Sequence, residues 1–533
     1  MNSVQVLVVG AGPTGLALAS QLMAFGAQVR LIDRAWDRAH ESRALAIQPR
    51  TLEVLRNLGV TDKLVAAGNP AMRMSLHTHG RERSVPLFDL GMQDTAYPYL
   101  LFLSQAETER LLGQHLNDVG VHIERGVELV GLERGVDGAV ASLRHGDGRE
   151  EHVTARYVVG CDGAHSTVRH LAGIGFEGGT YPQTFVLADL EADSLDGGAA
   201  HAFLAERGML FFFPLGHPAS WRMLLMRPPA DPTPSDAPVT LNEMQTLADS
   251  YTGGRIRLHD PVWMTNFRLH HRAAARYRAG PVFLAGDAAH IHSPAGGQGM
   301  NTGVQDAVNL GWKIAHALRG DSDPALLDTY ELERAPVGRM VLRFTDRAFT
   351  IATSTNPLVR LARTRVAPAL IPVVMAPRFV RSIAFRTISE LSITYRHSPL
   401  STQGHGAPRR GPRPGDRLPD TPLSSDGPTL HQLTAASGWH LVLCGPPHAW
   451  PSSATAQLDR YALTVHGLGA PDPTAAGQSA AAPAIRRLGV TNGSAALYLV
   501  RPDGHIGYRS GGDDLSGLLA YLDRWVGRPP EAS

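Results

Sequence analysis

The chain has 533 residues, a formal net charge of +1, and a composition that is 43% hydrophobic and 19% charged. This length exceeds what one hydrophobic core usually serves, so we expect two or three domains. Because the charge is nearly balanced, we expect no nucleic acid and no anionic membrane among the partners.

Cysteines and targeting signals are sparse. Cys161 and Cys444 are the two cysteines, and they lack the spacing of metal ligands. We therefore expect neither a disulfide framework nor a metal site, and a reducing compartment. The chain enters an apolar stretch after three residues, which predicts no signal peptide. The most apolar later stretch, Val366 to Met375, is too short to span a bilayer, so we expect a cytoplasmic protein.

The first elements in chain order are a strand, a helix and a second strand. Val4 to Val9 is a short apolar run, typical of a strand buried on both faces. A helical pattern runs from Thr14 to Phe25, and a second strand from Gln28 to Ile32 ends at Asp33. This order predicts a βαβ unit of the doubly wound type.

The α/β pattern continues to about residue 178 and then changes. We expect a helix at Pro49–Leu58, irregular structure over 70–100, a helix after Ser104, and strands at Val121–Ile123 and Tyr157–Gly160. From 180 to 275, strands joined by turns predict an antiparallel sheet and a second domain. These strands are Phe185–Ala192, His201–Pro214 and Trp221–Met226.

The first pattern returns at Pro281, so one domain is interrupted and re-entered. A strand is expected at Val282–Ala285 and a helix from about Thr302 to Leu318, and residues 325–395 are expected to be mostly helical. A stretch rich in Pro, Gly and Arg over 400–428 predicts a linker. The strands expected beyond it, in a separate α/β domain with a helix near its end, are His440–Cys444, Ala462–Val465 and Ala496–Val500.

The motif Gly10-Ala11-Gly12-Pro13-Thr14-Gly15 lies between the first strand and its helix. Gly10 permits a tight turn, Gly12 lets the backbone approach a pyrophosphate, and Gly15 lets helix and strand pack closely. The helix N-terminus favours the anionic diphosphate, and Asp33 would accept from ribose hydroxyls. This motif alone predicts a dinucleotide and leaves NAD and FAD open.

Two further glycine-containing motifs follow strands. The run GCDGAHSTVR over 160–169 contains an Asp-Gly pair, which by itself is a common turn and leaves its function open. In the run AGDAAH over 285–290, Asp287 ends a buried strand, where a carboxylate can accept from a ribityl hydroxyl. The helix that begins near Asn301 would aim its N–H groups at a flat ring and stabilise an anionic reduced flavin.

These motifs resemble those of a known enzyme family. GAGPTG, GCDGAHSTVR and AGDAAHIHSPAGGQGMNTGVQDAVNLGWK, in this order, are similar to the class A FAD-dependent aromatic hydroxylases of the para-hydroxybenzoate hydroxylase type, as are SRALAIQPRTLEVLRNLG and SQAETERLL. The similarity is greatest to the polyketide hydroxylase and phenol hydroxylase branch, whose members carry a thioredoxin-like C-terminal domain.

The resemblance implies an α/β fold in three parts. A doubly wound, Rossmann-like FAD-binding domain with a helical extension is interrupted by an antiparallel-sheet substrate domain, and a thioredoxin-like α/β domain follows. The expected ranges are 1–70, 100–178 and 276–398 for FAD binding, 71–99 and 179–275 for substrate, 399–428 for the linker, and 429–533 for the last domain. Because Cys444 is its one cysteine, that domain is expected to be structural rather than a dithiol catalyst.

The resemblance also implies the residues of the site. Those expected to bind FAD are Gly10, Gly12, Thr14, Gly15, Asp33, Arg34, Arg43, Gln105, Asp162, Asp287, Gly297, Gly299, Met300 and Asn301. Asp162 is associated in this family with both FAD and the nicotinamide donor. Arg43 and Pro294 are the catalytic candidates beside the flavin C4a. Phe211, Phe213 and Pro294 are candidates for the substrate pocket, with core packing as the alternative for the phenylalanines. For His290 and His292 a structural role is favoured.

The resemblance implies a flavin-dependent monooxygenase that uses NADPH or NADH and O2. A flavin C4a-hydroperoxide would hydroxylate a polycyclic aromatic intermediate of polyketide type, in a site that excludes water. Since the sequence holds no second GxGxxG, the nicotinamide donor is expected to bind transiently, without a Rossmann domain of its own. A Baeyer–Villiger oxygenase or epoxidase, and a non-oxygenating FAD-binding protein, remain alternatives. We expect a monomer or a homodimer.

Overall fold

A computed structural model describes the chain from Asn2 to Gly527 except for several short stretches. Those stretches are 39–43, 72, 79–80, 87–91, 206–207, 217, 228–236, 293–296, 321, 355, 363–365, 367–369, 371–372, 425–426, 447–448, 451–455, 470–481, 492–493 and 513–514. Among the described residues, no helix is long and apolar enough to cross a membrane.

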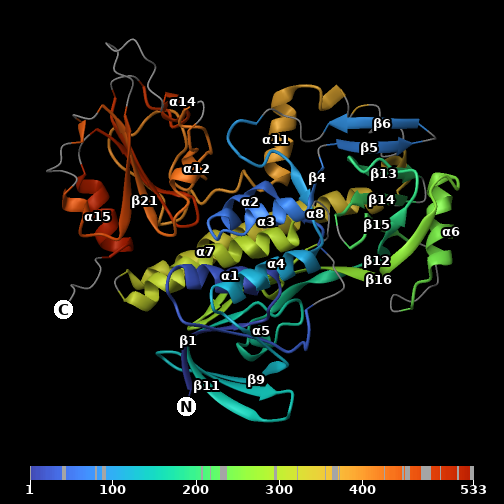
Figure 1. The fold of residues 1–533 in the computed structure, drawn as a ribbon, viewed down its shortest axis with the longest axis horizontal. Coiled ribbons are helices and arrows are strands. Elements are labelled where there is room, and N and C mark those ends of the chain that lie inside the picture. Colours follow the sequence, from blue (N-terminus) through green and yellow to red (C-terminus); the bar gives the residue numbers. More distant parts are fainter. Residues whose placement is uncertain are drawn as a thin grey trace.

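One eight-stranded sheet is built around four parallel pairings and lies at the bottom of Figure 1. Its order is β17-β18-β11-β1-β2-β8, with β9 and β10 attached to β11 as an antiparallel extension. The strands are β1 (Asn2–Val9), β2 (Val29–Asp33), β8 (Ile123–Arg125), β9 (Val127–Arg134), β10 (Ala139–His145), β11 (Glu150–Gly160), β17 (Arg278–Ala279) and β18 (Val282–Leu284). The helices α1 (Pro13–Ala24), α4 (Gln105–Asp118) and α5 (Thr167–Leu171) lie among them in the chain. The apolar run of β1 is buried from Val6 to Val9, as expected for a central parallel strand.

A second eight-stranded sheet lies on the right of Figure 1. Its order is β19-β16-β12-β15-β14-β13-β5-β6, antiparallel except for the β5–β13 pair. The strands are β5 (Arg73–Thr78), β6 (Arg81–Pro86), β12 (Phe176–Ala192), β13 (Ala199–Ala205), β14 (Gly208–Pro214), β15 (Trp221–Met226), β16 (Leu258–Ala274) and β19 (His290–Ile291). Helix α6 (Leu241–Thr252) covers one face, where Met244 and Ala248 pack on Phe212 and Met223.

A small antiparallel sheet and two helices lie between these units. Its strands β3 (Ala46–Ile47), β7 (Leu100–Phe102) and β4 (Asn69–Ala71) pair in the order β3-β7-β4. The helices are α2 (Pro49–Arg56) and α3 (Thr61–Ala67). Ala46 and Phe102 share an apolar cluster with Phe213 of β14, so this small sheet connects the two large ones.

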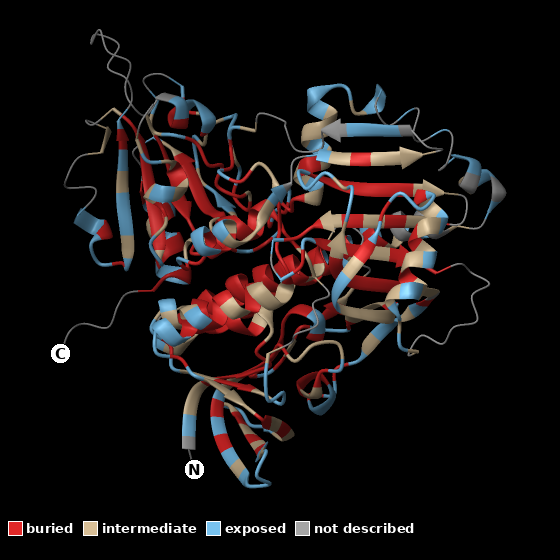
Figure 2. Cartoon of the chain, turned by 45° about the vertical axis from the view of Figure 1, so that its right-hand side comes forward, coloured by how far each residue is buried: buried red, intermediate tan, exposed pale blue. Residues whose placement is uncertain are grey.

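Helix α7 (Gly299–Arg319) runs through the centre of the molecule, and Figure 2 shows it buried over most of its length. Every residue from Met300 to His316 is buried, so the helix is packed on all sides over this stretch. It is followed by α8 (Asp328–Thr353), α9 (Pro357–Leu361) and α11 (Arg378–Ile388). In the part of the chain that the structure describes, this agrees with the mostly helical structure expected over 325–395.

The C-terminal unit is a mixed sheet flanked by helices, drawn in orange and red in Figure 1. The strands, in the sheet order β20-β24-β23-β21-β22, are β20 (Thr402–Gln403), β24 (Ile506–Gly511), β23 (Ala496–Val500), β21 (Trp439–Gly445) and β22 (Leu463–Gly469). The helices are α12 (Leu430–Leu433), α14 (Ala482–Arg487) and α15 (Ser516–Trp525). Trp312 of α7 packs against Trp439 with ring centroids 5.4 Å apart, so the C-terminal unit rests on the central helix.

The structure differs from the sequence expectation in several places. Helix α6 lies within 180–275, where strands joined by turns were expected. Residues 70–100, expected to be irregular, contain the β5–β6 hairpin. The expected strand His201–Pro214 is two strands, β13 and β14, paired as a hairpin. The stretch expected as a linker packs on the C-terminal unit, because β20 pairs with β24 and Arg417 bridges to His505. The Pro and Gly content of this stretch correctly predicts little regular structure, but the stretch is packed on the C-terminal unit and is not an unattached linker.

Candidate active site

The glycines of the first loop are required by close packing between β1, α1 and the end of β11. Gly10 has φ +102°, and a Cβ there would lie 2.4 Å from the carbonyl oxygen of Cys161. A Cβ on Gly15 would lie 1.9 Å from the carbonyl oxygen of Gly10. Both positions therefore exclude a side chain, for the steric reasons that the sequence predicted.

Gly12 differs, because nothing in the described protein requires a glycine there. Its φ of −75° is ordinary, and no described atom lies within 4 Å of where its Cβ would be. Gly12 is also the N-cap of α1, and no described side chain caps this helix end. The open space and the free N–H groups fit a ligand phosphate that approaches the backbone.

A cavity of about 210 Å³ opens beside this loop, at the carboxyl ends of β1, β2 and β11. Its lining includes Gly12, Asp33, Arg34 and Asp162. The Asp33 carboxylate accepts hydrogen bonds from the N–H groups of Ala11 (2.7 Å) and Ala35. It thereby fixes the loop and lines the cavity, and its contact with the adenosine ribose stays a prediction. Ligands of open α/β sheets bind at this edge.

Asp162 is held by its own loop. The Ser166 hydroxyl donates to its Oδ1 at 2.5 Å and the Val168 N–H donates to its Oδ2 at 3.1 Å. Burial raises the pKa of Asp162 above its usual value, although these hydrogen bonds act in the opposite direction. Arg169 donates to the carbonyl oxygens of Ala164 and Ala288, which anchors this loop to the next motif. The carboxylate therefore has a structural role, and its contacts with FAD and the donor remain predictions.

The turn that carries Asp287 lies against Thr14 of α1, and the early part of α7 lies against the same side chain. A Cβ on Gly286, whose φ is +62°, would lie 2.5 Å from the Thr14 hydroxyl oxygen, and one on Gly303 would lie 2.4 Å from it. Gly286 and Ala288 are buried, whereas Asp287 between them is exposed. The turn thus presents the Asp287 carboxylate away from the core, as a ribityl contact requires.

A buried acidic residue that the sequence did not single out supports this turn. Asp306 of α7 accepts from the N–H of Gly286, from Nε2 of His290 (2.6 Å) and from Nε of Arg334 (2.6 Å). Burial alone would raise its pKa, but Arg334 and His290 more than offset this and hold the pKa of Asp306 below its usual range. His290 is fully buried in this network, which agrees with the structural role favoured for it. The one available signal was spacing, because the polar residues Thr302, Asn309 and Lys313 recur with Asp306 on one face of the helix.

The first turn of α7 is locked to β3. The Asn301 amide donates to the carbonyl oxygens of Ala46 (2.8 Å) and Gly297 (2.7 Å), and its Oδ1 accepts from the Gln48 N–H. Because α7 begins at Gly299 rather than Thr302, Met300 lies in this first turn as well. No described side chain caps this end of α7. Its N–H groups are therefore not taken up by a side-chain cap, and their contact with a flavin pyrimidine stays a prediction.

Two predicted residues, Arg43 and Pro294, lie outside the described residues. Gln105 is described, and its Oε1 accepts from the N–H of Ala44 while its Nε2 donates to Glu109. Gln105 thus positions the backbone directly after Arg43.

The candidate substrate residues lie on the face of the second sheet opposite α6. Phe211 and Phe213 are half-buried and stack with ring centroids 5.7 Å apart and planes 10° apart. Phe213 also packs on Phe102 of the small sheet, with centroids 5.6 Å apart. Phe212 points to the other face and is buried under α6. The run therefore supplies both alternatives that the sequence left open, core packing for Phe212 and an aromatic surface for its neighbours.

Comparisons with known proteins agree with this architecture. A family model described as FAD binding domain matches residues 3–345, and one described as aromatic-ring hydroxylase, C-terminal, matches residues 411–529. The chain is 37% identical to the 6-methylpretetramide 4-monooxygenase of Streptomyces rimosus over 536 residues, covering 97% of this chain and 93% of that protein.

Two solved structures are similar over nearly the whole chain. OxyS anhydrotetracycline hydroxylase from Streptomyces rimosus has a TM-score of 0.77 at 31% identity, covering 99% of this chain and 100% of that one. The flavin-dependent monooxygenase PieE, solved in complex with FAD and substrate, has a TM-score of 0.79 at 25% identity, covering 98% of both chains.

The chain belongs to the family of FAD-binding aromatic-ring hydroxylases. It is a flavin-dependent monooxygenase, and FAD is its cofactor. The expected fold class, enzyme class and cofactor are confirmed, whereas the individual contacts to FAD stay predictions.

Proposed function

We propose that this enzyme hydroxylates a fused-ring aromatic intermediate of polyketide type. The observation that carries the proposal is the stacked, half-buried pair Phe211 and Phe213, on the face of the second eight-stranded sheet that also contacts Phe102 of the small sheet. Aromatic rings prefer offset-stacked or edge contacts with other rings, so this surface suits a planar fused-ring substrate. The names of the similar proteins, which cite pretetramide and anhydrotetracycline, support the same class.

The chain's own residues hold the cofactor and shape the site. Gly12 and the N-terminus of α1 would receive the diphosphate, Asp33 the ribose and Asp287 the ribityl chain. The N-terminus of α7 would face the pyrimidine edge and favour negative charge there. When bound, FAD supplies the transfer of one oxygen atom from O2 to the substrate, with electrons from NADPH or NADH. The half-buried aromatic rings on this sheet face would help to keep water from the reacting ring.

The same function implies how the enzyme receives electrons and in which cellular compartment it works. We infer that the nicotinamide donor binds transiently at the flavin, since the described fold contains one dinucleotide-binding sheet. We also infer a cytoplasmic location, which the two free buried cysteines support.

The test is product analysis under heavy oxygen. The FAD-loaded enzyme is incubated with a fused four-ring phenolic polyketide under ¹⁸O2, with NADPH or NADH in separate reactions. We expect one heavy oxygen atom per product molecule, located by NMR on an aromatic carbon as a hydroxyl group. A lactone or an epoxide would favour the corresponding alternative chemistry. Oxidation of the nicotinamide without any oxygenated product, across a panel of such phenols, would overturn the proposal.

A further inference from the structure

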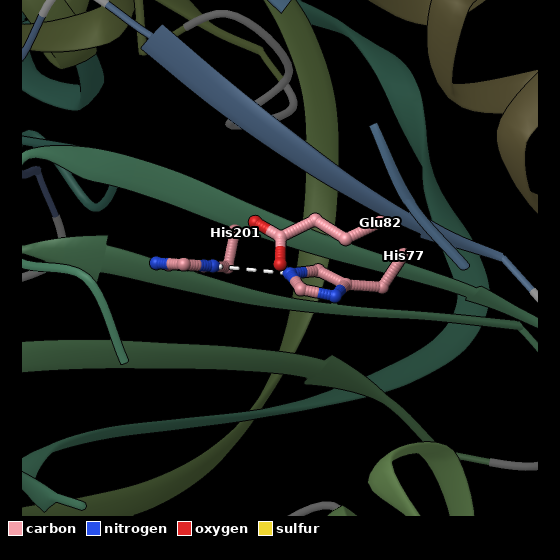
Figure 3. A group of neighbouring side chains, drawn as sticks. All are labelled: His77, Glu82 and His201. Carbon is pink, nitrogen blue, oxygen red and sulfur yellow. Dashed lines mark hydrogen bonds between the residues drawn. The ribbon is translucent and has the colours of Figure 1, made fainter. Parts of the chain in front are cut away.

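Three side chains that can bind a metal lie close together on the second eight-stranded sheet (Figure 3). His77 of β5 lies opposite Glu82 of β6 in the strand register, and His201 comes from β13, the strand that pairs with β5 on its other side. One ligand atom from each residue lies within 4.8 Å of the other two. The three ligands thus come from three adjacent strands of one sheet.

The two imidazoles are already close through the nitrogens that would bind an ion. Nε2 of His201 donates to the carbonyl oxygen of Asp196 at 3.0 Å, which leaves the lone pair on Nδ1. This Nδ1 lies 3.1 Å from Nε2 of His77. Histidines that bind metals generally donate their other ring N–H to a carbonyl or a carboxylate in this way. In a tetrahedral zinc site with Zn–N bonds of about 2.0–2.1 Å, two ligand nitrogens lie about 3.3 Å apart. The 3.1 Å between the nitrogens of His77 and His201 is close to this distance.

Packing fixes the rings but leaves the carboxylate accessible. The His77 ring stacks on Phe203 with centroids 4.1 Å apart and planes 8° apart, and His201 packs edge-on against Trp221. His201 is buried, whereas Glu82 is exposed and can turn toward an ion. Rigid nitrogen ligands with one adjustable carboxylate form a site that needs little rearrangement.

We propose that His77, Glu82 and His201 bind a divalent metal ion of the zinc type, with water completing the coordination. Imidazole and carboxylate ligands in this number suit Zn²⁺ and similar borderline ions. The site lies on the α6 side of the sheet, because Phe203 belongs to the cluster packed under α6. It therefore faces away from Phe211 and the flavin, and the ion would fasten the edge hairpin β5–β6 to β13.

A hydrogen-bonded histidine pair without metal is the competing explanation, and the chain contains a matched example. His440 and His466 of the C-terminal sheet lie 3.0 Å apart through Nδ1 and Nε2, with rings stacked at 22°. His440 also pairs with a carbonyl oxygen, that of Ala436, at 2.8 Å. Among the described residues, however, only the group at His77 has a third ligand within reach.

The experiment is calorimetric titration of the chelator-treated, FAD-loaded enzyme with ZnCl2. We expect one Zn²⁺ per chain. Changes outside the ligand shell alone shift metal affinity by about 10–100-fold, so Glu82→Gln should weaken binding at least that much. His77→Gln should abolish binding, whereas His466→Gln should leave it unchanged. Melting temperature and FAD content confirm that each variant is folded, and since Glu82 is exposed its variant is the primary one.

Three outcomes would overturn the proposal. One is no zinc binding by the parent enzyme at micromolar concentrations. Another is a Glu82→Gln variant that folds and binds zinc as the parent does. The third is zinc found by anomalous scattering at another position.

Discussion

Arg222 of β15 and Asp189 of β12 form a buried, bidentate ion pair. Nε and Nη2 of Arg222 donate to the two carboxylate oxygens at 2.7 Å each, and both side chains are almost completely shielded from solvent. Nη1 of Arg222 donates to the carbonyl oxygen of Ala44 at 2.9 Å, and Trp263 donates to the same carboxylate. The pair therefore joins the second eight-stranded sheet to the segment at Ala44, which Gln105 also holds.

Removing one partner of this ion pair should be costly. Asp189→Ala leaves the Arg222 guanidinium buried without its counterion, and such losses lower the free energy of unfolding by about 3–5 kcal/mol. Urea denaturation of the FAD-loaded enzyme measures the change. Asp118→Asn is the control, because its ion pair with Lys63 is exposed and is worth about 0–1 kcal/mol. Equal effects of the two substitutions would contradict the role assigned to Arg222 and Asp189.

Gly12 and Gly15 should separate cofactor binding from folding. Gly12→Ala meets no described protein atom, so we expect the FAD-free protein to melt as the parent does while its FAD Kd rises at least about tenfold, a loss of about 1.4 kcal/mol. Gly15→Ala would collide with the Gly10 carbonyl and should lower the melting temperature even without FAD. Flavin fluorescence titration and thermal melts check both. Unchanged FAD affinity in Gly12→Ala would show that no ligand approaches this backbone.

Phe211 and Phe212 of β14 point to opposite faces of the sheet, so alanine substitutions at the two positions should have different effects on stability and on KM. Phe212→Ala empties a buried site under α6 and should reduce the free energy of unfolding by about 3–5 kcal/mol. Phe211→Ala removes an aromatic contact worth about 0.5–1.5 kcal/mol, so we expect KM for the aromatic substrate to rise several-fold with a much smaller loss of stability. Steady-state kinetics and chemical denaturation distinguish the two. A KM that stays constant in Phe211→Ala would remove this residue from the substrate surface.

Glu390 should make stability depend on pH. Burial raises its pKa to about 7, against an ordinary value of 4.5, although Thr302 and Gln305 donate hydrogen bonds to it. The folded state therefore binds more protons between these pH values. The stabilisation from the protonated carboxyl is complete below pH 4.5 and is lost as the pH rises through about 7.

The glutamine side chain of the Glu390→Gln variant is neutral at every pH, so this variant should lack the pH dependence of stability that Glu390 causes. We expect the variant to have a free energy of unfolding similar to that of the parent at about pH 5. At about pH 8 the variant should be more stable than the parent by up to about 3 kcal/mol. Denaturation curves at both pH values give the difference. A constant difference between parent and variant across this range would show that Glu390 does not titrate with a raised pKa.

The features predicted correctly from the sequence are mostly local. The βαβ unit around Gly10 follows from an apolar run, a helical period and a glycine turn within 33 residues. Trp221–Met226 was predicted with the bounds that β15 has in the structure. The β5–β6 hairpin was missed because Arg73–Thr78 and Arg81–Pro86 mix charged and polar residues at the edge of a sheet, where alternation is weak.

The features that the sequence could not provide depend on partners far along the chain. Asp306 and Arg334 are both buried in one network, but only the packing of α7 on α8 brings them together. Arg222 and Asp189 meet because β12 and β15 pair in one particular register. His77 and His201 are separated by 124 positions and carry no motif spacing. Charged residues inside a fold need a known partner before their burial can be predicted.

The central position of α7 limits how this enzyme can be recombined with its relatives. Its first turn is where we expect the flavin, and about 20 Å further along, at 1.5 Å per residue, Lys313 pairs with Glu333. Glu333 also accepts two hydrogen bonds from Arg501 of the C-terminal unit. A chimera whose new C-terminal unit lacked an arginine at the position of Arg501 would leave the buried Glu333 with Lys313 as its remaining cationic partner. Productive shuffling therefore has to carry α7, α8 and the C-terminal unit together as one inherited block.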